Sequence, residues 1–352
     1  MLIYYVLIVL WIAYYAVCKE KIKNKRKRNV AVAIGLGISV FLLGALRAAE
    51  VGTDTETYLI AYQKGNDHFF KGVEFGYYLY RTLFYNLHFT NQMYLAIVAL
   101  TCVFCYTKFF IKYSNNTFYS YFLHLTIGLL PMSMSGIRQS LAICITLFAY
   151  DYILKKDLVR FLIIVGIATL FHQSACIFFI VYIFRFIKFD KLKFSAFWIA
   201  AIFAAAFSKE IFMFALKLSP FDYSIYFSDY FKNTSVNFLV ILIAVLIPLV
   251  CNLFAVRANM DEREIIIFRL AQGISCMYAL FCILTRDIQI AGRLSFYFMS
   301  ANLILIPNTI ETIRIRSTKI WANIACVILP LFQFIISIPG NSIGIDQYSF
   351  FW

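Results

Sequence analysis

Long apolar segments recur along almost the whole chain, and this pattern constrains the fold more than any other feature. A helix needs about 17 apolar residues to cross the hydrocarbon core of a bilayer, and most of these segments reach that length. Only helices or closed barrels satisfy backbone hydrogen bonds in lipid. The sequence therefore predicts an all-α polytopic membrane protein, a single integral membrane domain over residues 1–352 with about 12 transmembrane segments. The predicted segments are 2–18, 30–46, 92–111, 117–134, 137–154, 158–171, 173–187, 194–208, 236–256, 264–284, 290–309 and 320–338.

The composition excludes several other classes of protein. Hydrophobic residues make up 62% of the chain and charged residues 14%, against about 25% charged in soluble domains. This excludes a cytosolic enzyme, a disordered chain and a small disulfide scaffold. We interpret the net charge of +14 as a topology signal and expect no nucleic-acid partner. The nine cysteines mostly lie in apolar segments and indicate no metal or redox site.

The stretch 158–187 decides the topology, because it forms either one long helix or a short hairpin. Cytoplasmic loops collect lysine and arginine. With a hairpin, 22 of the 32 basic residues face the cytoplasm, whereas one helix would leave 17 there. The count favours a hairpin, both termini outside, and outer loops 47–91 and 209–235 that cap a site. Each half spans only about 21 Å, less than a ~30 Å core. The turn at His172 is therefore expected at the floor of a water-accessible mouth.

Three arginines on the predicted outer side lie at or inside helix ends, where a charge is costly unless it is paired or hydrated. Arg47 closes the second segment, Arg138 opens the fifth and Arg293 lies inside the eleventh. Snorkelling is the simpler explanation, but arginine also suits bidentate binding of phosphate oxygens. Segment 135–140 begins a helix whose free N–H groups favour an anion, so we predict a pyrophosphate clasp there. Arg293 and Tyr297 are predicted to share a helix face.

The loop 47–91 carries carboxylates, glycines and tyrosines that suit a sugar-binding wall, with an ordinary interfacial loop as the alternative. Thr53 and Glu56 fit a capping box, which predicts a short helix from Thr53. Asp54 and Tyr58 would share one face of this helix. Loop 209–235, with Asp222, Tyr223, Tyr226, Asp229 and Tyr230, is a candidate cover for the mouth.

The two histidines within apolar segments are expected to differ. His172 lies at the predicted break of the hairpin, so it is a candidate general base or ligand contact. His124 lies inside a predicted helix, so we expect a packed, hydrogen-bonded core residue.

These residues together resemble the EpsG-type family, the Wzy-like membrane polymerases of bacterial exopolysaccharide, capsule and O-antigen. The resemblance covers about residues 30–310, and the tail 339–352 lies outside it. It rests on motifs that share one predicted side of the membrane. The motifs are Arg47…Gly52-x-Asp54-x3-Tyr58, Glu74-x-Gly76-Tyr77, Gly136-Ile137-Arg138-Gln139-x2-Ala142, Phe171-His172-x-Ser174-Ala175 and Gly292-Arg293-x3-Tyr297-Phe298.

The resemblance implies a membrane glycosyltransferase at the outer face of the bacterial cytoplasmic (inner) membrane. It would transfer a glycan from undecaprenyl diphosphate onto another lipid-linked repeat unit, with flippase and chain-length or export proteins as partners. Transfer from a diphosphate needs charge neutralisation on the leaving group and a base on the acceptor hydroxyl. We expect no metal or other cofactor. The expected roles are diphosphate binding by Arg138 and Arg293 with support from Arg47, a base that is either His172 or Asp54, and sugar or supporting contacts from Tyr58, Glu74, Gln139 and Tyr297.

Alternatives from other classes stay open at this point. A flippase or transporter of lipid-linked oligosaccharide would place charges near the bilayer midplane in repeated broken helices, whereas here they gather at one leaflet. An O-antigen ligase-type transferase uses the same donor chemistry, and a structural membrane scaffold is the remaining alternative. The repeat-unit sugars, the linkage and the stereochemical outcome have no signature in the sequence.

Overall fold

Helices make up nearly all regular structure of the described residues. The computed structural model describes residues 1–65, 73–187, 191–208, 210–211, 214, 237–286, 289–337 and 343–352. Within these residues no β-strand occurs, and one isolated bridge joins Arg47 to Phe350. The prediction of an all-α membrane protein is confirmed.

Six helices of the described part are long and apolar enough to cross a membrane. These are α1 (Leu2–Lys21), α2 (Lys25–Ala45), α5 (Asn91–Tyr113), α8 (Ile137–Leu154), α14 (Glu262–Leu284) and α17 (Arg316–Ser337). Side chains such as Val9, Ile199 and Trp321 are 64%, 69% and 68% exposed, as expected of residues that face lipid. The predicted count of about 12 spans is not confirmed, because the remaining apolar helices are shorter.

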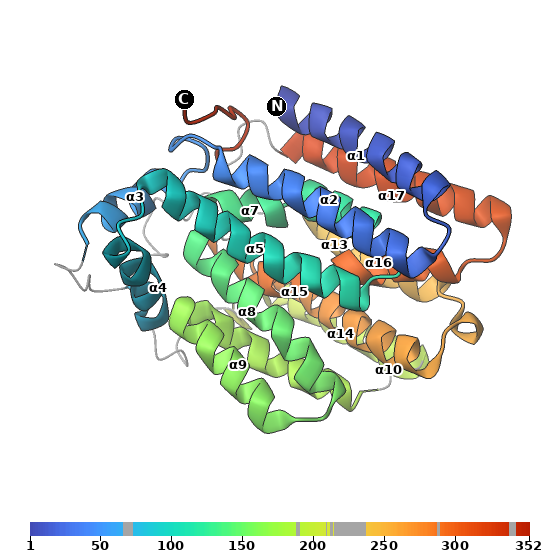
Figure 1. Cartoon of the computed structure of the whole chain (residues 1–352). Coiled ribbons are helices and arrows are strands. Elements are labelled where there is room, and N and C mark those ends of the chain that lie inside the picture. Colours follow the sequence, from blue (N-terminus) through green and yellow to red (C-terminus); the bar gives the residue numbers. More distant parts are fainter. Residues whose placement is uncertain are drawn as a thin grey trace. The chain divides into compact units, whose positions relative to one another are not determined.

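The chain divides into two compact units, residues 1–179 with 313–352 and residues 180–312. In the first unit, α1 and α17 lie side by side, as do α2 and α5 (Figure 1). Its shorter elements are α3 (Thr55–Gln63), α4 (Phe75–Asn86), α6 (Thr117–Thr126), α7 (Leu129–Ser135), α9 (Leu158–Phe171) and the first part of the 3-10 helix η1 (Gln173–Arg185). The second unit contains the rest of η1, α10 (Lys191–Ala206), α13 (Phe238–Phe254), η3 (Arg257–Asn259), α14, η4 (Gln289–Ser295), α15 (Phe296–Met299) and α16 (Asn302–Thr312).

The chain reversal predicted at His172, within the stretch 158–187, is confirmed. His172 has an extended backbone (φ −157°, ψ 119°) between α9 and η1. The ring centroids of Phe161 and Phe179 are 6.4 Å apart, whereas eighteen residues of one continuous helix would separate them by about 27 Å. The chain therefore reverses direction at His172.

Two predicted spans are broken into shorter helices. The span 117–134 is wrong as a single helix, because Gly128 adopts a φ of +111° and separates α6 from α7. The span 290–309 is replaced by η4, α15 and α16. Ser295 lies at the end of η4 and Ser300 directly after α15. Their hydroxyls donate to the carbonyls of Gly292 and Tyr297, which competes with regular helical bonding.

The two predicted outer loops are described to different extents. Loop 47–91 contains α3 and α4, except that residues 66–72 lie outside the described residues. Almost all of loop 209–235, including its aspartates and tyrosines, also lies outside them. The capping roles of both loops, the single-domain organisation and the outer position of the termini stay predictions.

Candidate functional site

Glu74 joins three segments of the first unit at one carboxylate. It immediately precedes α4. Its Oε2 lies 2.7 Å from Nη1 of Arg138, at the start of α8. Its Oε1 lies 2.9 Å from Nδ1 of His172 and accepts a bond of 3.2 Å from the backbone N–H of Gln173. Loop 47–91, the start of α8 and the turn at His172 therefore meet here. We call Tyr58, Glu74, Arg138 and His172 the Glu74 cluster.

Gly76 allows α4 to approach the end of α9 and so brings Glu74 to the turn. A Cβ atom at Gly76 would lie 2.9 Å from the carbonyl oxygen of Leu170 and 3.0 Å from the ring of Phe171. The rings of Tyr80 and Phe171 pack edge to face, with centroids 6.1 Å apart. Without a side chain at position 76, the N-terminus of α4 fits directly against the hairpin.

The Glu74 carboxylate is the most buried charge of the cluster. Its side chain is 6% exposed, while those of Arg138 and His172 are each 27% exposed. Burial alone would raise the pKa of Glu74, but the His172 hydrogen bond and the Arg138 charge outweigh it and hold the pKa at about 2. Glu74 is therefore a permanent anion that orients its two partners, and not a group that exchanges protons near neutral pH.

The contact with Glu74 fixes how His172 can act. When the imidazole is neutral and Nδ1 donates to the carboxylate, Nε2 carries the lone pair and can accept a proton. The same arrangement stabilises the imidazolium after proton uptake, as the carboxylate does in a catalytic triad. The geometry therefore suits His172 to general-base chemistry.

Tyr58 extends the cluster onto α3. Its hydroxyl accepts a long bond of 3.5 Å from Nε of Arg138, whose Cζ lies 5.9 Å from the ring centroid. The ring meets Tyr77 edge to face at 5.9 Å, and the Tyr77 hydroxyl accepts from Tyr94 at 2.9 Å. A line of tyrosines thus connects Arg138 to α5.

The predicted start of the short outer helix is wrong by two residues. Asp54 is the N-cap of α3, and no side-chain capping bond forms. The box would need the Thr53 N–H, but this group donates to the carbonyl of Ile343 at 2.9 Å. Asp54 still lies one turn before Tyr58, and its N–H donates to Oγ of Ser135 at 3.3 Å.

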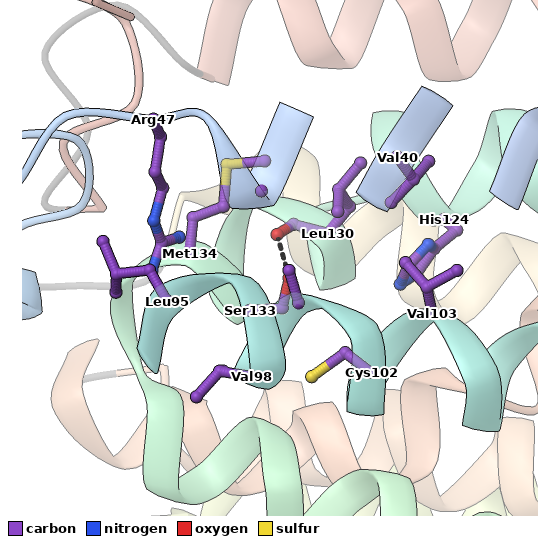
Figure 2. Close-up of a pocket in the computed structure, with 12 residues that line it drawn as sticks. Val40, Arg47, Leu95, Val98, Cys102, Val103, His124, Leu130, Ser133 and Met134 are labelled. Atoms are coloured by element: carbon purple, nitrogen blue, oxygen red, sulfur yellow. Dashed lines mark hydrogen bonds between the residues drawn. The ribbon is translucent and has the colours of Figure 1, made fainter. Parts of the chain in front are cut away.

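Arg47 occupies a different kind of environment from Arg138. It is 2% exposed and lines a small cavity of about 20 Å³ between α2, α5, α6 and α7. Figure 2 shows its guanidinium pointing toward Leu95 and Met134, with His124 further along the cavity. Within the part of the chain that the structure describes, Nε of Arg47 has no hydrogen-bond partner. Burial lowers the pKa of Arg47 to about 10, so it stays charged at neutral pH.

His124 is packed as predicted, with its ring centroid 4.0 Å from that of Tyr106. The predicted hydrogen bonding is wrong, because neither ring nitrogen has a partner among the described residues.

The remaining predicted site residues are distributed over both units. Gln139 follows Arg138 in α8 and is buried. Arg293 lies in η4 and Tyr297 in α15, which follow each other directly in the second unit, and their common helix face stays a prediction. The roles of these three residues stay predictions.

A sugar or supporting contact was predicted for Glu74, but its position between His172 and Arg138 was not predicted. One feature of the sequence could have indicated a buried, paired carboxylate. Glu74 is the one charged residue in the stretch from Val73 to Tyr80. A lone carboxylate among apolar residues has to find a cation or several donors.

Comparison with known proteins identifies the family but adds no characterised relative. No curated protein and no solved structure matches the chain. The model of the EpsG family matches residues 30–350, which extends beyond the predicted resemblance and includes most of the tail. The chain therefore belongs to the EpsG family of polysaccharide-polymerase-type membrane proteins.

Proposed function

We propose that this protein polymerises exopolysaccharide or O-antigen repeat units. It transfers a glycan from undecaprenyl diphosphate onto the non-reducing end of another lipid-linked repeat unit, at the outer face of the cytoplasmic membrane. Membership of the EpsG family supports the reaction class. The observation that carries the proposal is the pairing of one buried carboxylate with both a histidine and an arginine.

In the proposed reaction, a hydroxyl oxygen of the acceptor sugar attacks the anomeric carbon of the donor glycan. The new glycosidic bond forms as the bond between that carbon and the diphosphate oxygen breaks. The hydroxyl proton goes to Nε2 of His172, and undecaprenyl diphosphate leaves with the bonding electron pair. Glu74 holds the imidazole in the correct tautomer and stabilises its positive charge.

The leaving diphosphate needs positive charge and hydrogen-bond donors. Arg138 supports this role because Glu74 and Tyr58 fix its guanidinium at the start of α8, where backbone N–H groups also favour an anion. Arg293 belongs to the second unit, and its contact with the diphosphate stays a prediction from the sequence. Flippase and chain-length or export proteins are the proposed partners.

The test is to reconstitute purified protein into liposomes with a lipid-linked repeat unit and to separate the products by size. A ladder of polymers is expected from the natural sequence. Arg138→Ala should reduce the ladder at least about 100-fold while the protein stays in the membrane. Arg160→Ala is the matched control, because Arg160 also lies in the first turn of a helix but has a 65% exposed side chain paired with Asp157.

Other products would identify other functions. Translocation of the lipid-linked unit without a change in size would indicate a flippase. Transfer only onto an acceptor that carries no repeat unit would indicate a ligase. Normal chain lengths from Arg138→Ala would contradict the proposed role of Arg138.

A further inference from the structure

The tail 343–352 is paired with the first part of the outer loop, although about 300 residues separate them in the chain. Backbone N–H groups of both the tail and the loop donate hydrogen bonds across this contact, which includes the bridge between Arg47 and Phe350. The bonds run from Phe351 N to Leu46 O (3.1 Å), Ala48 N to Ser349 O (3.0 Å), Gly52 N to Gly344 O (2.8 Å) and Thr53 N to Ile343 O (2.9 Å).

Gly344 is required where the tail meets the loop most closely. Its φ is +67°, which is unfavourable for a residue with a side chain. A Cβ atom there would lie 2.7 Å from Oγ1 of Thr53 and 3.0 Å from its backbone nitrogen. Any larger residue would push the loop and the tail apart at the residue before Asp54.

On its other side, the same loop rests on the junction of α7 and α8. The hydroxyl of Thr55 donates to the carbonyl of Met134 at 2.8 Å. Gly52 has a φ of +95°, and a Cβ there would lie 2.2 Å from that carbonyl oxygen. Residues 51–55 are thus held between the tail and the segment that leads into Arg138, and α3 begins at the last of them, Thr55.

The tail is itself anchored to long helices. The hydroxyl of Tyr4 in α1 donates to the carbonyl of Ile345 at 3.1 Å. The hydroxyl of Tyr348 donates to the carbonyl of Leu43 in α2 at 2.8 Å. Ile345 is 2% exposed. These contacts give the tail a fixed position from which it can hold the loop.

We infer that the tail 343–352 is a positioning segment for the site. It fixes loop 51–55, and through α3 it sets the position of Tyr58 against Arg138. The inference rests on the proposed polymerase function, because its consequence is a change in transfer rate. The family match includes the tail to residue 350, but the sequence predicted no role for it.

The test combines Gly344→Ala with hydrogen exchange and the polymerisation assay on the full-length protein in liposomes. The variant should raise the exchange rates of the amides of Ala48, Gly52 and Thr53 and leave those in the middle of α8 unchanged. It should lower the rate at saturating substrate by roughly tenfold or more, because small displacements of positioned groups are costly. Tyr348→Phe removes one anchoring bond and gives a milder version of the change if Gly344→Ala folds poorly. Gly166→Ala is the control, since a Cβ there meets nothing within 4 Å.

The outcomes separate this inference from the proposed function. Unchanged exchange in residues 48–53 would show that the tail does not hold the loop. Faster exchange with an unchanged rate, or faster exchange throughout α8 and α9 as well, would contradict a positioning role. If the natural sequence makes no polymer, the proposed function fails, and the exchange rates still decide whether the tail fixes the loop.

Discussion

Arg138 and Arg47 are both arginines at helix ends of the first unit, yet their surroundings differ. Arg138 is 27% exposed and paired with Glu74 at 2.7 Å. Arg47 is 2% exposed, and none of the ion pairs among the described residues includes it. A cavity of about 20 Å³ has room for a single water molecule. Position at a helix end therefore does not distinguish an accessible, paired arginine from an enclosed one, whereas the partner and the exposure of the side chain do.

The largest effect is expected at the histidine of the Glu74 cluster. His172→Ala should lower polymer formation by about 10²–10⁴-fold, because it removes the proposed base. Asp54→Asn should lower it by less than about tenfold, since the Glu74 carboxylate orients His172. Initial rates with a lipid-linked repeat unit measure both. The reverse order would assign the base to Asp54.

The same substitution at the two arginines should have opposite effects on stability. Arg138→Met leaves the buried Glu74 with one cation fewer and should destabilise by about 1–3 kcal/mol. Arg47→Met replaces a buried charge that has no ion-pair partner among the described residues with an apolar side chain, and it should be neutral or stabilising. Apparent melting temperatures in one detergent measure the difference. Strong destabilisation by Arg47→Met would contradict this prediction, because it would mean that the Arg47 charge makes a stabilising interaction.

Low pH should weaken the Glu74 cluster and leave the Arg47 environment unaffected. The pKa of Glu74 is about 2, below its ordinary 4.5, so its stabilising contribution is complete above pH 4.5 and is lost as the pH falls toward 2. The natural protein should therefore melt roughly 2–4 °C above Glu74→Gln at pH 6, and the gap should shrink by pH 3. A gap that stays constant with pH would contradict the depressed pKa.

The smallest effect is expected from Tyr58→Phe. It removes only the hydroxyl that accepts the 3.5 Å bond from Arg138 and keeps the ring below the guanidinium. We expect a loss of about two- to fivefold in kcat/KM, in line with one weak hydrogen bond. Tyr58→Ala, which also removes the ring, should be more severe. Equal losses from both would show that the ring contributes nothing.

Features that depend on local pattern were predictable from the sequence. The apolar segments gave the helical class, and the break at His172 followed from the charge count and was confirmed by the contact between Phe161 and Phe179. Asp54 and Tyr58 were expected on one face of a short helix, and α3 starts after Asp54 and carries Tyr58. Periodicity and charge asymmetry are properties of neighbouring residues, so they remain readable without coordinates.

Contacts between distant segments were not predictable in the same way. The sequence placed Arg47, Arg138 and Arg293 in one class, because it shows the residue type and the helix end but not the partner. Nothing in the sequence around Glu74 indicates that it contacts His172, which lies 98 residues away. The start of α3 was misassigned for the same reason, since the tail takes the donor that the capping box needs.

The close packing at Gly76 has a consequence for sequence variation in this family. A methyl group at position 76 would overlap the backbone of Leu170, and a side-chain change at 170 cannot move a carbonyl oxygen. A relative with alanine at position 76 would need a shorter or differently tilted α9. Substitutions at 76 and length changes around 170–173 should therefore arise together in the same lineages.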